Sequence, residues 1–155
     1  QNMAVKKIAL GSDHAGAQLK EEIIEHLNGK GYEIKDFGTS ADKPADYPDP
    51  ALAVAESVVS GEFDRGILCC GTGIGISIAA NKVPGVRCAM LSDTFSARAT
   101  RLHNDANVMA LGGRVIGPEL AKDIVDMFLE TEFSGVERHQ KRIDKIAEIE
   151  KKYSK

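Results

Sequence analysis

The sequence predicts a doubly wound α/β domain built around a five-stranded parallel sheet. Strand patterns and helix patterns alternate along the chain, which is the signature of repeated βα units. One strand pattern, Gly66–Cys70, is apolar throughout, as expected for a strand buried on both faces. The length of 155 residues lies in the usual range of about 100–200 for one domain, so we expect a single domain over residues 1–155.

The first half of the chain supplies two strands before the central one. Lys7–Leu10 is short and apolar, and Tyr32–Phe37 alternates enough polar residues to suit a sheet edge. Between them, apolar residues recur at four-residue spacing along the helix Ala15–Asn28, which a following glycine ends. The prolines and aspartates of Ala41–Pro50 indicate a loop, and the small residues of Ala51–Val59 indicate a helix.

The second half continues the alternation after Gly66–Cys70. The expected elements are the helix Ile74–Asn81, the strand Arg87–Leu91, the helix Thr94–Leu102, the strand Val108–Leu111, a helix from Pro118 and a C-terminal extending helix over residues 136–152. Pro118 suits a helix start because its missing N–H group would be unpaired there. The last helix is charged on most sides, with Ile143, Ile146 and Ala147 as a narrow apolar stripe.

Five such units favour a Rossmann-like sheet flanked by helices, with strand order 2-1-3-4-5. That order reverses between the first and third strands, and ligands bind at the carboxyl ends of the strands there. We therefore expect the loops Gly11–Gly16 and Cys70–Ser77 to meet.

The composition excludes several classes of protein. Lys and Arg total 20 against 23 Asp and Glu, and the net charge of −3 argues against a nucleic-acid binder. The longest uncharged stretch, Gly66–Asn81, is broken by glycines and hydroxyl residues, so we expect no membrane association. No signal-peptide pattern opens the chain, where Gln1 and Asn2 precede the first Met and resemble an expression scar. Three cysteines without metal-ligand spacing suit a cytoplasmic protein without disulfides or a metal.

The first of the two loops carries Asp13 and His14, which together can act as acid, base or anion contact. The alternative is structural, with Asp13 as a helix cap and His14 simply exposed.

The second loop, Cys70-Gly-Thr-Gly-Ile-Gly-Ile-Ser77, has glycines at alternate positions just before a helix. Such a turn lets backbone N–H groups approach an anion closely. It matches neither the dinucleotide fingerprint nor the P-loop, so a nucleotide site is disfavoured, although tight packing alone could also explain the glycines. Cys70 lies at its mouth, where a thiolate could serve as nucleophile or base, whereas Cys69 and Cys88 fit buried inert thiols better.

Two further groups lie later in the chain. Arg138 and Arg142 are four residues apart on one helix face and could hold a phosphate, unless they are only part of a solvated face. His103 follows a helix and could be either functional or a dipole contact.

Five motifs occur in order: Gly11-Ser-Asp-His-Ala-Gly16, Asp46-Tyr47-Pro48, the Cys70–Ser77 loop, Arg101-Leu-His-Asn-Asp105 and Arg138-His-Gln-Lys-Arg142. Together they resemble the ribose-5-phosphate isomerase type B family, which also includes allose-6-phosphate isomerases and galactose-6-phosphate isomerase subunits. The resemblance runs from Lys7 to about Ile149.

The resemblance implies a cofactor-free interconversion of ribose 5-phosphate and ribulose 5-phosphate, a pentose phosphate pathway reaction, through a cis-enediol(ate). It implies that Cys70 is the base, that Asp13 and His103 open the furanose ring, and that Thr72 lies beside the enediol oxygens. The substrate-binding residues it implies are His14, Tyr47, Gly71, Gly73, Gly75, Asn104, Arg114, Arg138 and Arg142. One branch of the family uses a glutamate at the position of Gly75, so this chain resembles the cysteine branch.

A geometric argument, combined with the resemblance that places His103 at the substrate, predicts a shared active site. The helix Thr94–Leu102 runs back along the sheet and is about as long as a strand, so His103 should lie at the opposite sheet edge from Cys70 of its own chain. A homodimer, or a dimer of such dimers, would bring the two residues together. A hexose-phosphate isomerase and a non-catalytic sugar-phosphate sensor remain the alternatives, although Cys70, Asp13 and His103 together favour a self-sufficient enzyme.

Overall fold

The computed structural model describes residues 5–154, and it contains a five-stranded parallel sheet with strand order β2-β1-β3-β5-β4. The elements, in chain order, are β1 (Lys7–Ser12), α1 (Ala17–Leu27), β2 (Glu33–Asp36), α2 (Pro48–Val59), β3 (Arg65–Cys70), α3 (Ile74–Ala80), β4 (Cys88–Met90), α4 (Thr94–Ala99), the π-helix η1 (Thr100–Asn104), β5 (Val108–Gly112), α5 (Pro118–Glu130) and α6 (Glu137–Tyr153). The predicted expression scar, Gln1 and Asn2, lies outside the described residues.

The Rossmann-like fold class is confirmed, but the expected order of the last two strands is wrong. β5 pairs with β3 on one side, with Cys70 opposite Gly112, and with β4 on the other. All five residues of β5 are buried, so this strand needs a partner on each side. β4 has only three residues and leaves Met90 exposed, which suits the sheet edge.

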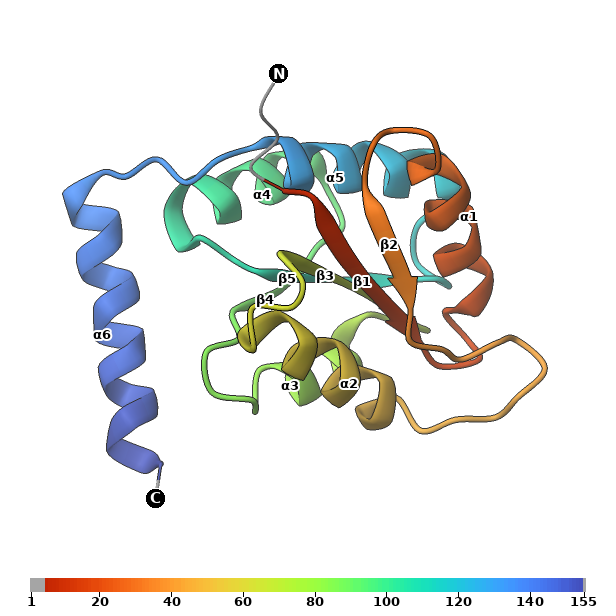
Figure 1. Cartoon of the computed structure of the whole chain (residues 1–155), viewed down its shortest axis with the longest axis horizontal. Coiled ribbons are helices and arrows are strands. Elements are labelled where there is room, and N and C mark those ends of the chain that lie inside the picture. Colours follow the sequence, from red (N-terminus) through yellow and green to blue (C-terminus); the bar gives the residue numbers. More distant parts are fainter. Residues whose placement is uncertain (1–4, 155) are drawn as a thin grey trace.

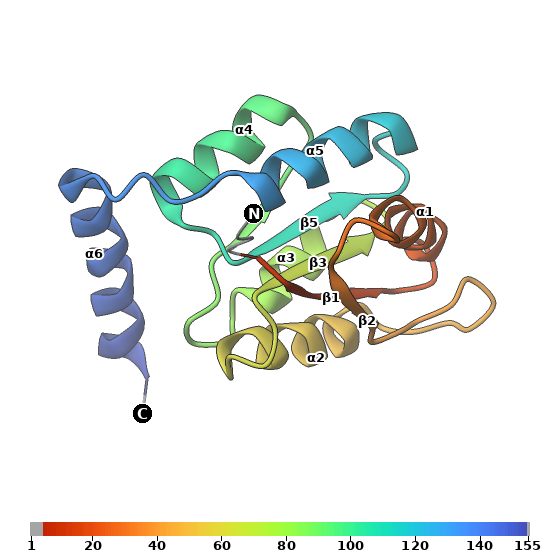
Figure 2. The ribbon, with the colours of Figure 1, turned by 45° about the horizontal axis from the view of Figure 1, so that its top comes forward.

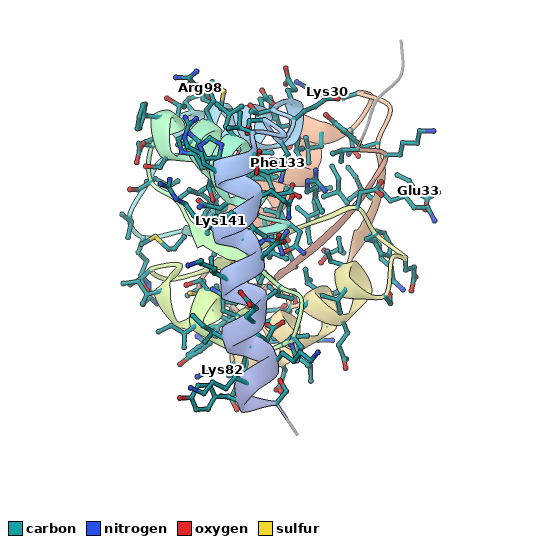
Figure 3. All side chains as sticks on the ribbon, turned by 90° about the vertical axis from the view of Figure 1, so that its left-hand side faces the viewer. Lys30, Glu33, Lys82, Arg98, Phe133 and Lys141 are labelled. Carbon is teal, nitrogen blue, oxygen red and sulfur yellow. The ribbon has the colours of Figure 1, made fainter. Side chains whose placement is uncertain are left out.

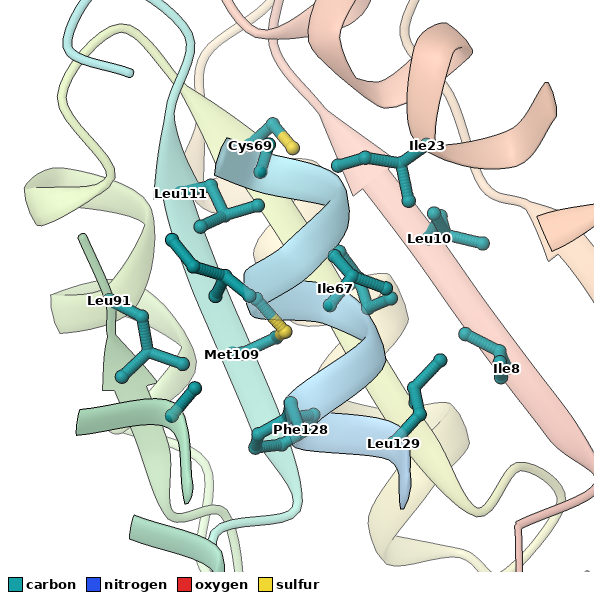
Figure 4. Close-up of a cluster of buried hydrophobic side chains, with 14 of the residues drawn as sticks. Ile8, Leu10, Ile23, Ile67, Cys69, Leu91, Met109, Leu111, Phe128 and Leu129 are labelled. Carbon is teal, nitrogen blue, oxygen red and sulfur yellow. The ribbon is translucent and has the colours of Figure 1, made fainter. Parts of the chain in front are cut away.

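Helices cover both faces of the sheet, with α1, α4 and α5 on one face and α2 and α3 on the other (Figure 1). In the first of these layers, Phe128 and Leu129 of α5 lie over the apolar residues of β3 and β5, among them Ile67 and Met109 (Figure 4). This double coverage is the reason why the central strands are apolar along their whole length.

The strand order reverses at β1, which pairs with β2 on one side and β3 on the other. The edge position predicted for the second strand is therefore confirmed. The loops that follow β1 and β3 emerge side by side at the carboxyl edge of the sheet, where the sequence places both candidate loops.

The helix expected over Thr94–Leu102 ends earlier as an α-helix than the sequence predicts. An α-helix continues only to Ala99, and residues 100–104 form a wider π-turn. Asp105 closes this turn in the left-handed region, with φ 46°. π-turns are rare and occur frequently at functional sites.

Helix α6 stands beside the rest of the molecule and is reached through an extended connector after α5 (Figures 1 and 2). Figure 3 views it from outside, with the rest of the molecule behind it. Only His139 and Ile143 of α6 are buried. Of the predicted apolar stripe, Ile146 and Ala147 remain exposed.

Among residues 5–154, no helix is both long enough and apolar enough to cross a membrane.

Candidate active site

Three loops meet at the carboxyl edge of the sheet. A side chain at Gly16 would overlap the carbonyl of Cys69, and the N–H group of Asp13 donates to that carbonyl at 3.3 Å. The third loop follows β5, and its Gly113 N–H group donates to the Cys70 carbonyl at 2.8 Å. The predicted meeting of the first two loops is confirmed, and β5 adds the third because it lies next to β3.

Cys70 ends β3 and is almost fully buried at this meeting point. The backbone N–H group of Gly73 donates a hydrogen bond to its sulfur, with the nitrogen 3.1 Å from Sγ. An N–H group aimed at the sulfur would stabilise negative charge on it.

Each glycine of the turn makes room for a neighbour. A Cβ atom on Gly73, whose φ is +81°, would lie 2.9 Å from the backbone of Leu111. A Cβ on Gly75 would lie 2.7 Å from the Tyr47 ring, and one on Gly71 would lie 3.3 Å from an Arg114 guanidinium nitrogen. The alternate spacing therefore lets the ring of Tyr47 and the guanidinium of Arg114 close over the turn.

Asp13 is buried, and its Oδ1 accepts a hydrogen bond from the Gly16 N–H group at 3.0 Å. Gly16, rather than Asp13, is the N-cap of α1. His14 is exposed, and its Nδ1 lies 3.4 Å from the backbone nitrogen of Ala45, which donates to it. Asp13 lies beside the end of β3, so its structural role does not remove it from the site.

Thr72 is exposed on the turn, and its Oγ1 accepts from the Ile74 N–H group at 3.2 Å. The predicted residues that gather at this edge are called here the cysteine half: Asp13, His14, Tyr47, Cys70, Gly71, Thr72, Gly73, Gly75 and Arg114.

The remaining predicted residues form a second group, called here the histidine half: His103, Asn104, Arg138 and Arg142. They line a cavity of about 390 Å³ between η1 and α6, together with His139, Ile143 and Ile146. The cavity carries two guanidinium groups and two imidazoles, so its charge suits an anion.

His103 and His139 contact each other within this cavity, with ring centroids 4.4 Å apart. Nδ1 of His139 lies 2.9 Å from Oγ of Ser134. Burial lowers the pKa of His139, and the positive charges near it, on His103, Arg138 and Arg142, lower it further.

The two halves lie at opposite edges of the sheet. Cys70 is at the carboxyl end of β3, whereas the Asn104 carbonyl accepts from Arg87 at the amino end of β4. The arrows of β3 and β5 point away from α6 in Figure 2. One copy of the chain therefore does not bring Cys70 and His103 together.

The other two thiols differ from Cys70. Burial raises the pKa of Cys69 to about 12, and its side chain lies within the core (Figure 4). Burial also raises the pKa of Cys88 to about 12, and this residue is partly buried. Neither thiol is suited to act as a base near neutral pH.

The sequence did not indicate three side chains that build the histidine half: Arg101, Ser134 and His139. Arg101 and His139 stand within the quoted motifs. However, an arginine or a histidine on a predicted helix is ordinarily expected at the solvent-exposed surface, so neither was singled out. The four-residue spacing of Arg101 and Asp105 is the one sequence feature that could have indicated an ion pair at this position. Within residues 5–154, no cluster of three or more His, Cys, Asp or Glu side chains could hold a metal ion.

The fold and the two halves define a class: an α/β protein with a thiol beside a glycine-rich turn and a cationic cavity. These features are typical of an enzyme that acts on a small phosphorylated molecule.

Comparison with known proteins names the family. Residues 8–146 match the family Ribose/Galactose Isomerase. The ribose-5-phosphate isomerase B of Escherichia coli is 51% identical over 148 residues, which are 96% of this chain and 99% of that protein. The galactose-6-phosphate isomerase subunit LacB of Clostridium acetobutylicum is 42% identical over 92% of this chain and 82% of its own length.

Among solved structures, ribose-5-phosphate isomerase B of Clostridium thermocellum superposes with a TM-score of 0.93 at 59% identity, covering 96% of this chain and 99% of that one. The chain therefore belongs to the ribose/galactose isomerase family and is an isomerase.

Proposed function

We propose that the chain interconverts ribose 5-phosphate and ribulose 5-phosphate, with Cys70 as the base, in the pentose phosphate pathway. The similarity to ribose-5-phosphate isomerase B of E. coli and C. thermocellum supports the pentose phosphate as substrate. The position of Cys70 supports the mechanism, because its sulfur lies at the glycine turn with an N–H group aimed at it.

In the proposed reaction, Asp13 and His103 first exchange the protons that open the furanose ring. The Cys70 thiolate then takes the proton from C2 of the open aldose. The C–H electron pair becomes the C1–C2 double bond, and the carbonyl electrons move to O1, giving a cis-enediolate. Cys70 returns its proton to C1, and the O2 proton passes to O1; the C1–C2 double-bond electrons form the new C1–H bond, and the O2–H electrons form the C2 carbonyl of the ketose. The sugar needs no oxidant, because C1 is reduced as C2 is oxidised.

The residues around Cys70 supply what these steps require. The amides of the turn and the hydroxyl of Thr72 would hold the enediolate oxygens, and such a donor contributes about 10²–10³-fold. Proton transfer by a positioned base contributes about 10²–10⁴-fold. His14, Arg138 and Arg142 would bind the phosphate, with Asn104, Tyr47 and Arg114 as further substrate contacts.

We also propose that each active site combines the cysteine half of one copy with the histidine half of another. The separation of the halves supports this, since the reaction needs both. The exposed apolar residues of α6, Ile146, Ile149 and Tyr153, support the use of this helix as a contact between copies. The minimal assembly is then a homodimer, and a dimer of dimers is compatible with it.

Complementation tests the shared site. Cys70→Ala and His103→Ala chains carrying different affinity tags are co-expressed, and mixed dimers are purified on both tags. A mixed dimer has one site with both defects and one with neither, so about half of the wild-type activity should return. Purified mixed dimers without activity would refute the shared site.

The substrate is tested by a coupled isomerase assay with ribose 5-phosphate, allose 6-phosphate and galactose 6-phosphate, with a chelator present. We expect the highest kcat/KM with ribose 5-phosphate. A higher value with a six-carbon phosphate would support the alternative that the similarity to LacB raises. Tight binding of ribose 5-phosphate without turnover would instead indicate a sugar-phosphate sensor.

A further inference from the structure

We infer that Arg101 is the positioning residue of the histidine half. It fixes η1, which carries His103 and Asn104, relative to α6, which carries the two arginines of this half. This inference rests on the proposed function, because it concerns residues to which that function assigns substrate contacts. Arg101 itself points into the protein and is 2% exposed, so it is not a substrate contact.

The guanidinium of Arg101 closes the π-turn from inside. Its Nη1 donates to the carboxylate of Asp105 at 2.8 Å and to the carbonyl of Ala106 at 2.7 Å. Asp105 is the residue with positive φ that ends η1. A left-handed conformation disfavours a residue with a side chain, and the ion pair offsets that cost at the turn that carries His103 and Asn104.

The same side chain reaches the second element. Its Nε donates to the carbonyl of Thr131 at 3.0 Å, where α5 ends and the connector to α6 begins. The connector is tied to η1 a second time by the Ser134 N–H group, which donates to the Leu102 carbonyl at 3.4 Å. Arg101 therefore fixes η1 against the segment that sets the position of α6, with Arg138 and Arg142 on it.

Arg101 also packs against the core. Its guanidinium carbon lies 5.7 Å from the centroid of the Phe128 ring, which belongs to the core of α5. A planar group with several donors can bond two carbonyls and a carboxylate at once, which a lysine ammonium at the end of a flexible chain would do less well.

The first test compares Arg101→Met and Arg101→Lys with Arg98→Met, which removes an exposed arginine one turn earlier. Displacement of reacting groups by about 1 Å can lower a rate by about 10²-fold. We expect Arg101→Met to lower kcat/KM about 10²-fold, through both a lower kcat and a higher KM, and Arg101→Lys to recover part of it. We expect Arg98→Met to match wild type. Wild-type kcat and KM in folded Arg101→Met would overturn the inference.

The second test uses mixed dimers purified on two tags, and it separates a local effect from a general loss of folding. Arg101→Met paired with Cys70→Ala should give about half of the wild-type activity, because both defects then fall in one site and the other site carries neither. Paired with His103→Ala it should stay near background. Each of the two sites then contains one defective histidine half.

Other outcomes are equally decisive. Background activity with Cys70→Ala would overturn the inference if the control pair, Cys70→Ala with His103→Ala, is active. Recovery with His103→Ala would also overturn it. If the control pair itself is inactive, the shared site is refuted, and the kcat and KM of Arg101→Met alone decide whether Arg101 positions these residues.

Discussion

The sulfur of Cys70 accepts a hydrogen bond from the backbone N–H group of Gly73 at 3.1 Å. The two residues are adjacent because Gly73 adopts a positive φ and folds the turn back toward the end of β3. The turn that would bind the enediolate thus also contacts the proposed base, so charge on the sulfur and charge on the substrate would be stabilised by the same short segment.

Cys70→Ala is expected to lower kcat by about 10²–10⁴-fold, because it removes the base while changing little volume. Kinetics with ribose 5-phosphate and circular dichroism would measure activity and folding. Cys88→Ala is the matched control and should keep wild-type turnover. If Cys70→Ala retains activity within about tenfold of wild type, the thiolate base is excluded.

The three thiols should differ in their reaction with iodoacetamide at pH 8. With a pKa of about 12, Cys69 and Cys88 would carry the reactive thiolate in only about one molecule in 10⁴. We expect peptide mass spectrometry to find label on Cys70 first, and substrate to slow that labelling. Preferential labelling of Cys88 would contradict this prediction.

Arg142→Ala should raise KM for the phosphorylated sugar, because Arg142 lines the cationic cavity. Loss of a hydrogen bond to a charged group costs about 1.5–3 kcal/mol, which corresponds to roughly 10–150-fold. Lys141→Ala, on the same helix but outside this cavity, is the control and should change KM little. Equal KM values for the two variants would show that Arg142 does not bind the phosphate and is only part of a solvent-exposed helix face.

His139 should make stability depend on pH. Its pKa is lowered in the folded protein, so the unfolded chain takes up this proton at a higher pH, near the usual 6.5. The unfolding free energy should therefore rise with pH in the window just below 6.5 and level off above it.

Urea unfolding at fixed protein concentration, compared between wild type and His139→Asn, would measure this contribution. The asparagine retains a group able to bond Ser134 but does not titrate. Identical slopes for the two proteins below pH 6.5 would show that His139 does not contribute.

Lys20→Met should destabilise the fold. The Lys20 ammonium is buried and donates to the Asp36 carboxylate at 2.8 Å and to the Thr39 carbonyl at 2.7 Å. Loss of a hydrogen bond from a charged group costs about 1.5–3 kcal/mol. Urea unfolding would measure the loss, with Lys30→Met as an exposed control expected to stay within about 0.5 kcal/mol of wild type. A similar small change for Lys20→Met would be inconsistent with these two bonds.

The sequence alone was sufficient for the alternation of strands and helices and for the meeting of the two candidate loops. Both depend on local patterns: apolar periodicity along each element, and turn residues after each strand. Asp13 and Cys70 could be predicted as candidates for this reason, since Asp13 directly follows one strand and Cys70 ends another at the reversal of the sheet.

Only the tertiary structure decided the rest. The neighbours of β5 depend on which strand can bury both faces, a property of the whole sheet, and the expected order was wrong at that point. The bonds of Arg101 to Thr131 and Ala106, and the contact of His103 with His139, join elements that no local pattern relates. Such contacts follow from how helices pack against a shared core, which a periodic pattern along one element does not specify.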